Sequence, residues 1–193
     1  FSPQRLRRYK RGEIIKVHLG FNVGSEEGGL HYAVVVEKNN PKSSPVVTIV
    51  PLTSVKPNTN IERLPSGDVF LGNELFTSLN AKISSTSKHI QDELKLINEL
   101  GMNSESHIPE NNMEEISARS NAAIKELRLL DRMRNEVRKM RIGSIALVNQ
   151  ITTVSKIRIR DPKTDHDILS NIKLSNEKLD ILDAEIQRRY TNF

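Results

Sequence analysis

Short apolar runs of the kind that form β-strands dominate the start of the chain. Runs at residues 14–17, 33–36 and 46–52 are rich in β-branched side chains and are bounded by Gly, Pro, Asn or Ser. A glycine-rich loop at residues 21–29 separates the first two runs, and residues 39–41 supply the turn before the third. The pattern predicts a β-meander whose strands are long enough to close a small barrel.

Further along the chain the apolar positions take the spacing of helices. Ile83, Ile90, Leu94 and Ile97 share one face of a helix whose pattern stops at Gly101. After a polar connection, a second amphipathic set follows at steps of three or four, formed by Ala123, Leu127, Leu130, Met133, Val137 and Met140. Two such helices joined by a polar loop predict an antiparallel hairpin.

The last part of the chain combines strands with one more helix. Apolar runs at residues 142–151 and 154–159 predict strands, and alternation along the second puts Arg158 and Arg160 on its solvent side. Ser175 is a good N-cap for a final helix. One face of that helix carries Leu179, Leu182, Ile186 and Tyr190.

These elements predict an α+β fold, in which a small antiparallel β-barrel carries an inserted helical hairpin and a C-terminal helix. With 193 residues, the chain has room for a domain of about 110–130 residues and a large insertion. We expect the first part of the barrel in residues 1–78 and the hairpin in residues 79–141. Residues 142–193 would complete the barrel and add the last helix.

Composition narrows the class of protein. Aromatic residues make up only 4% and there is no Trp, so the core must be built mainly from Val, Ile and Leu. The absence of Cys excludes a disulfide framework, a thiolate zinc site and a cysteine nucleophile, and suits a reducing compartment. No apolar segment is as long as a membrane span, and no secretion signal opens the chain. We therefore expect a soluble, cytoplasmic protein.

The charge favours a polyanionic partner. The formal net charge is +5, which is also compatible with ordinary solubility. Because the basic residues are clustered along the chain, a polyanionic partner is the favoured interpretation. The basic clusters are Arg5, Arg7, Arg8, Lys10 and Arg11 near the start, and Lys156, Arg158, Arg160 and Lys163 further on.

Four segments, taken in order, resemble the MazF/PemK toxin family. Residues 11–15, Arg-Gly-Glu-Ile-Ile, are similar to the opening strand of that family, and residues 24–29, Gly-Ser-Glu-Glu-Gly-Gly, to the loop after it. Residues 44–53 resemble its central strand, which begins with Ser-Pro and ends in a functional Thr. Residues 143–151 resemble a later strand. Their order and spacing are more specific than any single motif.

The resemblance implies an SH3-like barrel, a homodimer, a neutralising antitoxin protein and cleavage of single-stranded mRNA. Two features depart from the family. His31 stands two residues after the Gly-Gly pair, where the family usually has a catalytic Arg. Residues 77–141 are also longer than the short connection that ordinary members have.

Cleavage of RNA without a metal requires a base for the 2′-hydroxyl, an acid for the leaving 5′-oxygen and donors for the phosphorane charge. His31 can serve as base or acid because an imidazole titrates near neutral pH. Thr53 ends an apolar strand, from which its hydroxyl can reach a phosphate. We expect these two residues to be catalytic; the alternative is that both are ordinary strand positions.

The glycine-rich loop and a later strand supply candidates for substrate binding. Ser25 and the backbone amides near Gly28 and Gly29 can form an anion cradle, although such loops are often simple turns. Gln150 can bond the edge of a base or satisfy backbone groups inside the fold.

Arg158 and Arg160 suit the phosphate backbone, or else form a solvated face. His89, His107 and His166 are expected at the surface, and no His pair has metal-ligand spacing. We therefore expect neither a metal nor a cofactor.

The sequence favours a type II toxin endoribonuclease that leaves 2′,3′-cyclic phosphate and 5′-hydroxyl ends. One alternative is a catalytically inactive barrel that binds nucleic acid or protein. Another is an interaction protein whose hairpin docks a partner helix. The hairpin is expected to project from the barrel and form a partner or dimer surface, unless it only pads the barrel.

Overall fold

The computed structural model describes residues 6–102, 110–138, 140–165 and 167–192. Its contacts divide the chain into two compact units. The first, Phe1–Ser78 with Met140–Phe193, holds every strand and the last helix and is called the sheet unit below. The second, Leu79–Lys139, contains most of two long helices and is called the hairpin unit.

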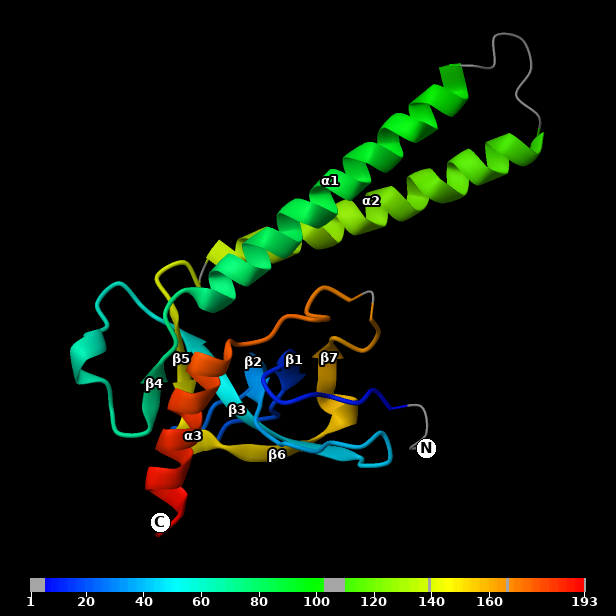
Figure 1. Ribbon diagram of the computed structural model, residues 1–193. Helices are drawn as coiled ribbons and strands as arrows, with labels where there is room; N and C mark the ends of the chain where they lie inside the picture. Colours follow the sequence, from blue (N-terminus) through cyan, green and yellow to red (C-terminus); the bar gives the residue numbers. More distant parts are fainter. Residues whose placement is uncertain (1–5, 103–109, 139, 166, 193) are drawn as a thin grey trace. The chain divides into compact units, whose positions relative to one another are not determined.

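One antiparallel sheet organises the sheet unit (Figure 1). Its strands are β1 Ile14–His18, β2 Leu30–Val35, β3 Val46–Ser54, β4 Asp68–Phe70, β5 Ser144–Leu147, β6 Thr152–Ser155 and β7 Ile159–Asp161. The order is β4-β5-β3-β2-β1-β7, with β6 also paired to β3. The predicted α+β class and the strands of the meander are therefore confirmed.

The prediction that the sheet closes into a barrel is wrong for the described residues. The end strands β4 and β7 have three residues each and are not paired with one another. Pro162 follows β7 directly and lacks an N–H that could extend the ladder. The sheet is thus open, with two short edges.

Alternation along the central strands builds the main core of the sheet unit. Odd-numbered residues of β1, β2 and β3 point to one face, because side chains alternate along a strand. The buried cluster on that face consists of Tyr9, Ile15, Val17, Ala33, Val35, Val47, Ile49, Val154 and Ile159. Burying this β-branched surface is the main favourable term for folding of the unit.

The strand opposite β3 is interrupted halfway. Ile49 pairs with Thr152 and Leu52 pairs with Ala146. Two residues of β3 therefore lie opposite five residues of the other strand, and the excess forms the 3-10 turn η3 Val148–Gln150. Pro51 lies on β3 at this point, where β3 has no partner on the interrupted side and pairs only with Ala33 of β2 on the other.

The predicted alternation around Arg158 is only partly correct. Arg158 and Arg160 are exposed as expected, but residues 156–158 form the 3-10 turn η4 Lys156–Arg158, and Ile157 is 59% exposed. Lys156 is buried instead, since its ammonium donates to the carbonyl of Pro41 at 2.9 Å and lies 5.9 Å from the Tyr9 ring centroid. Burial lowers the pKa of Lys156, and the charge of Glu37 opposes this.

The last helix, α3 Asn176–Tyr190, begins where the sequence predicts. Ser175 is its N-cap: the hydroxyl oxygen accepts from the Lys178 amide at 3.3 Å and the hydroxyl donates to Glu74 at 2.8 Å. Leu182 is fully buried on the inner face of α3, and the Tyr190 hydroxyl donates to the carbonyl of Val148 at 3.0 Å. Helix α3 therefore stabilises η3 Val148–Gln150 through this hydrogen bond.

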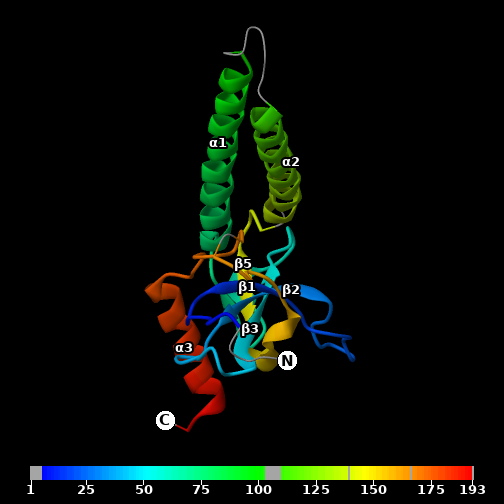
Figure 2. The same cartoon turned by 90° about the vertical axis from the view of Figure 1, so that its right-hand side faces the viewer.

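Both helices of the predicted hairpin are present, as α1 Glu74–Met102 and α2 Glu110–Arg138. Figures 1 and 2 show them side by side. Their buried apolar side chains recur at steps of seven, as in a coiled coil. The sevenfold series are Ile83, Ile90 and Ile97 on α1 and Ala123, Leu130 and Val137 on α2, while Leu75 and Leu79 on α1 and Met133 on α2 are buried between these steps or before them.

The seam between these helices is partly polar. Arg119 of α2 pairs with Glu93 of α1 at 3.4 Å, and Arg134 donates to Ser87 at 3.2 Å. Leu127, predicted on the inner face, is 37% exposed because the seven-residue repeat places it beside the seam.

Candidate functional site

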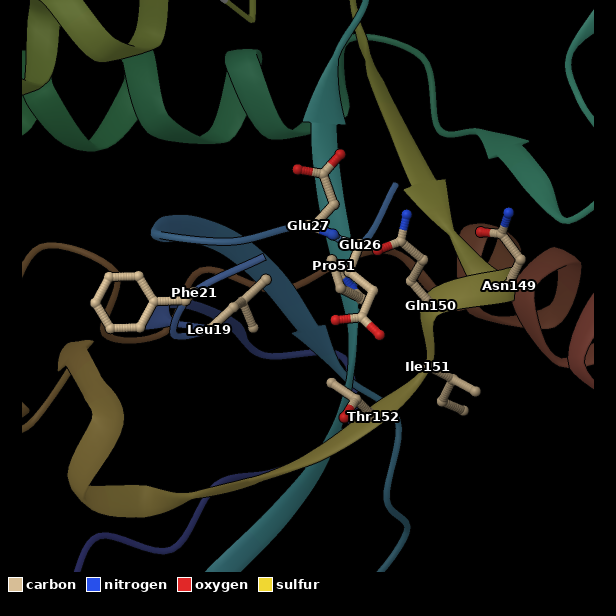
Figure 3. Close-up of a pocket in the computed structure, with 9 residues that line it drawn as sticks. All are labelled: Leu19, Phe21, Glu26, Glu27, Pro51, Asn149, Gln150, Ile151 and Thr152. Atoms are coloured by element: carbon tan, nitrogen blue, oxygen red, sulfur yellow. Dashed lines mark hydrogen bonds between the residues drawn. The ribbon is translucent and has the colours of Figure 1, made fainter. Parts of the chain in front are cut away.

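A pocket of about 350 Å³ opens beside the interruption of the strand opposite β3 (Figure 3). One wall is the β1–β2 loop and the other is η3 with the start of β6. The lining residues are Leu19, Phe21, Glu26, Glu27, Pro51, Asn149, Gln150, Ile151 and Thr152. The extra residues of η3 thus form part of a cavity instead of continuing the sheet.

The β1–β2 loop needs its glycines to close. Leu19 donates to the carbonyl of Gly29 and Gly29 donates to that of Gly20, both at 2.7 Å. Gly29 has φ +74°, a conformation that side chains disfavour. A Cβ on Gly28 would lie 2.7 Å from the backbone nitrogen of Asn22. The loop therefore folds back on itself only with glycine at these positions.

Gln150 ties the loop to η3 across the pocket. Its side-chain oxygen accepts from the Glu27 amide at 2.7 Å, and its NH₂ group donates to the carbonyl of Ser25 at 3.4 Å. Of the two roles expected for Gln150, the described contacts match the satisfaction of backbone groups.

His31 forms an ion pair with a pocket residue. Its Nε2 lies 3.2 Å from the Glu27 carboxylate, and both side chains are partly exposed. The contact is an ion pair when the ring is protonated, and it holds the imidazole against the carboxylate at the rim of the pocket.

Thr53 and His31 lie on the same face of the sheet. The β2–β3 pairing ends at Tyr32–Leu52, and His31 and Thr53 each lie one residue beyond that pair. Because side chains alternate along paired strands, both point to the face that carries Ala33 and Pro51. The catalytic role of the two residues stays a prediction.

Three loop amides that an anion cradle would use already have acceptors. The Glu26 amide donates to Val23 at 3.2 Å, the Glu27 amide to Gln150 and the Gly29 amide to Gly20. The Ser25 residue is exposed at the outside of the loop. A phosphate role for Ser25, Gly28 and Gly29 stays a prediction that rests on the Ser25 hydroxyl.

The two predicted arginines differ in their distance from the pocket wall. Arg158 donates to the carbonyl of Leu19 at 3.2 Å, so its guanidinium lies beside the loop. Arg160 lies on β7, and among the described residues no hydrogen bond connects it to the pocket.

The turn before β4 supports η3 from outside the pocket. Val148 donates to the carbonyl of Gly67 at 2.7 Å, and a Cβ on Gly67 would lie 2.9 Å from Asn149. Arg189 donates to the Ser66 hydroxyl at 3.1 Å. Burial raises the pKa of the neighbouring Asp68, while Arg189 opposes the rise.

Sequence reasoning missed Glu27, Phe21 and Asn149. The i, i+4 spacing of Glu27 and His31 was visible, but spacing across a loop and a strand does not fix a contact. Phe21 is fully exposed at the pocket although aromatics make up only 4% of the chain. An exposed aromatic within a glycine-rich loop was the one signal that could have found the pocket.

Within the described part of the chain, no cluster of three His, Asp or Glu side chains is placed to hold a metal ion. No helix of that part is long and apolar enough to cross a membrane. His89 is exposed on α1, as expected; His107 and His166 lie outside the described residues.

The sheet, the glycine-rich loop and the His31–Glu27 pair define a small α+β protein with a polar pocket at a break in a strand. Residues 10–119 match the family described as PemK-like, MazF-like toxin of type II toxin-antitoxin system. The match spans more than half of the chain, which therefore belongs to this family. It includes His31 and Thr53 and ends before Gln150 and Arg158. No curated protein matches the chain.

Proposed function

We propose that this protein is the toxin of a type II toxin-antitoxin system and an endoribonuclease that cleaves single-stranded mRNA. The observation that carries the proposal is the His31–Glu27 pair at the rim of the pocket, on the face shared with Thr53. Membership of the PemK-like, MazF-like family supports the toxin role.

The pocket lining suits a nucleobase better than a phosphate. Glu26 and Glu27 are acidic and would repel a phosphate, whereas their oxygens can accept from the amino group of a base or from a ribose hydroxyl. Asn149 adds an amide with both donors and an acceptor, and exposed Phe21 offers a ring for stacking. Single-stranded RNA is recognised by such stacking and edge contacts because its bases can be splayed out.

The proposed reaction uses proton transfer without a metal. His31 takes the proton of the 2′-hydroxyl as the 2′-oxygen bonds to phosphorus, or in its protonated form gives a proton to the leaving 5′-oxygen. The bond between phosphorus and that oxygen breaks, so the products carry a 2′,3′-cyclic phosphate and a 5′-hydroxyl. Glu27 orients the imidazole, while Thr53 and Arg158 supply donors for the phosphorane charge.

The remaining features of the proposal follow from family membership. The protein is cytoplasmic, forms a homodimer and is neutralised by a cognate antitoxin protein. Its open sheet is related to the SH3-like fold. No cofactor has a part in the proposed reaction.

Cleavage of a long unstructured RNA in excess chelator tests the proposal. The parent should give discrete fragments with 5′-hydroxyl ends, and His31→Ala should slow their formation by about 10²- to 10⁴-fold. His89→Ala is the matched control, because His89 is exposed on α1. A strict requirement for magnesium would contradict the mechanism. Binding of RNA without cleavage would instead leave a nucleic-acid-binding protein.

A further inference from the structure

A second pocket of about 430 Å³ lies where segments far apart in the sequence meet. Its lining residues are Leu6, Arg7, Arg8, Lys10, Glu13, Lys42, Lys163, Thr164, Asp165 and Asn171. Three cations of the cluster near the start, Arg7, Arg8 and Lys10, therefore meet Lys163 from the segment after β7 and Lys42 from the β2–β3 turn. Five cations face two carboxylates, a formal lining charge of +3.

Both carboxylates of the lining are already occupied by Arg7. This guanidinium lies 2.6 Å from Asp165 and 3.8 Å from Glu13, and it also donates to the carbonyl of Thr164 at 2.9 Å. Glu13 accepts a further hydrogen bond from the Lys10 amide at 3.0 Å. Arg7 thus fixes the pocket wall and neutralises its acids.

Asp167 lies just outside the lining and is engaged as well. Its oxygens accept from the amides of Lys163 and Thr164 at 2.6 and 2.9 Å, and from the Thr164 hydroxyl at 2.9 Å. Burial acts to raise the pKa of Asp167, but these hydrogen bonds and Arg7 outweigh it and the pKa is lowered. The Asp167 carboxylate therefore stabilises the loop at residues 163–164.

The other cations of the pocket have no such partner. Arg8, Lys10, Lys42 and Lys163 are exposed, and their side chains form no ion pair with any residue that the structure describes. An anion bound in the pocket would therefore find four cationic side chains that no described carboxylate neutralises. The pocket is accordingly built for negative charge.

We propose that this pocket binds phosphodiester groups of single-stranded RNA, apart from the pocket that contains Gln150. The inference rests on the proposed function for the class of its ligand. Among the described residues of the lining, Leu6 is the single apolar side chain and none is aromatic, so these residues offer no surface for a base or an apolar peptide residue. Phosphates need only point charges and donors, which is what the lining offers.

The two pockets lie at opposite ends of β1. Glu13 lines the cationic pocket and Leu19 lines the other, and these residues flank the strand. Six residues at about 3.3 Å each separate them by up to about 20 Å. One RNA strand can therefore place a base in the first pocket and its backbone in the second.

Binding of an uncleavable RNA analogue tests the inference. The probe is a fluorescent 2′-O-methyl oligouridylate of about twelve nucleotides, measured by anisotropy across a range of salt concentrations. The double variant Lys42→Glu/Lys163→Glu should bind about tenfold or more weakly. The slope of log affinity against log salt should shrink by about 0.7 for each phosphate that the variant no longer neutralises.

The matched control is Lys56→Glu/Lys125→Glu, which makes the same change of charge at exposed positions outside both pockets. It should keep the parent slope, and circular dichroism should show both variants folded. Equal slopes in the two variants would overturn the inference. Displacement of the oligomer by low-millimolar inorganic phosphate at matched ionic strength would assign the pocket to a small anion. Displacement by an oligoglutamate that the Lys42/Lys163 variant no longer binds would assign it to an acidic peptide.

The probe has no 2′-hydroxyl, so this result does not depend on cleavage. A parent that cuts no RNA but binds the oligomer through Lys42 and Lys163 would refute the proposed function alone. A parent that cuts RNA while both variants keep its slope would refute the inference alone.

Discussion

At the scale of single residues, position 31 can distinguish two contributions to the proposed cleavage: proton transfer by a side chain and stabilisation of charge on the phosphorane. A guanidinium at this position carries charge at every accessible pH but exchanges no proton near neutrality, whereas an imidazole does. We predict that cleavage by the parent changes between about pH 5 and 8, and that His31→Arg flattens this profile while keeping some activity. Initial cleavage rates of a fluorescent RNA across that range measure both. Identical profiles would show that His31 is neither the acid nor the base.

Tyr9 connects stability to alkaline pH. Its hydroxyl donates to the carbonyl of Pro162 at 2.7 Å, and burial raises its pKa above the ordinary value of 10, with Arg7 acting in the opposite direction. A raised pKa in the folded state favours the protonated phenol. The stability that it contributes is therefore complete below pH 10 and is lost as the pH rises toward the folded pKa.

We predict that Tyr9→Phe costs about 1–3 kcal/mol at neutral pH, because the Pro162 carbonyl loses its donor. Above about pH 10 the difference between parent and variant should narrow, by at most about 1.4 kcal/mol per pH unit. Urea unfolding of both proteins between neutral pH and about pH 11 gives the two curves. A difference that stays constant with pH would mean that Tyr9 ionises as easily folded as unfolded.

The sequence allowed us to predict the role of a residue where that role depends only on its neighbours in the chain. Ser175 was predicted as an N-cap because a cap needs only the next few residues, and the structure confirms it. The partner of His31 was not predicted, since the position of Glu27 depends on how the loop closes.

At the scale of elements, Gln150 joins the β1–β2 loop to η3. Gln150→Ala removes both hydrogen bonds, so we predict faster amide hydrogen exchange at residues 20–28 and slower RNA cleavage. The free energy of unfolding should fall by only about 1–3 kcal/mol, the range for two hydrogen bonds. Gln91→Ala, at an exposed position of α1, is the control. Unchanged exchange in the loop would show that other contacts hold it.

The periodicity of the sequence predicted most of the longer elements and missed the short ones: strand β4 and the 3-10 turns η2 Ile61–Arg63, η3 and η4. Strands β1 to β3 and all three α-helices follow from apolar spacing. Turn η3 does not, because it lies within the apolar run 142–151, which predicts one strand, and η4 does not, because the residues around Lys156 keep a strand-like alternation of apolar and basic types. The ammonium of Lys156 reaches Pro41 across the fold, and this long-range contact overrides the local pattern.

At the scale of the molecule, the sheet unit contains its own core. The buried cluster around Ile15 and Ile49 lies entirely in residues 1–78 or 140–193, and so does a smaller described cluster formed by Val55, Ile145 and Leu147. We predict that replacing Leu79–Lys139 by a flexible Gly-Ser linker leaves a protein that unfolds cooperatively. Thermal unfolding followed by circular dichroism tests this, with linkers of two lengths as a control for strain. Loss of folding with both linkers would favour the alternative that the hairpin pads the sheet.

The same shortened protein tests the hairpin as a surface for association. If the hairpin serves a partner or a second copy, light scattering should show a smaller assembly or antitoxin binding should weaken. A shortened protein unchanged in assembly, antitoxin binding and RNA affinity would show that the hairpin is dispensable for all three.

The order of the strands in the sheet could not be predicted from the sequence. Thr53 pairs with Ile145, a residue on the far side of both long helices in the chain. Apolar spacing gives the period of each strand but not its neighbour, so barrel closure was assumed from the number and length of strands. The three-residue edge strands β4 and β7 show why that assumption was wrong.

The 3-10 turn η3 has a consequence for how such a protein can diverge. On a continuous strand, adding one residue reverses the direction of every later side chain and exposes the core. Here separate ladders fix β5 and β6 against β3, on either side of residues 148–151. Insertions and deletions in that segment can therefore reshape the pocket wall while the sheet keeps its register. Substrate preference can change through the length of this turn without the loss of stability that a slipped strand would bring.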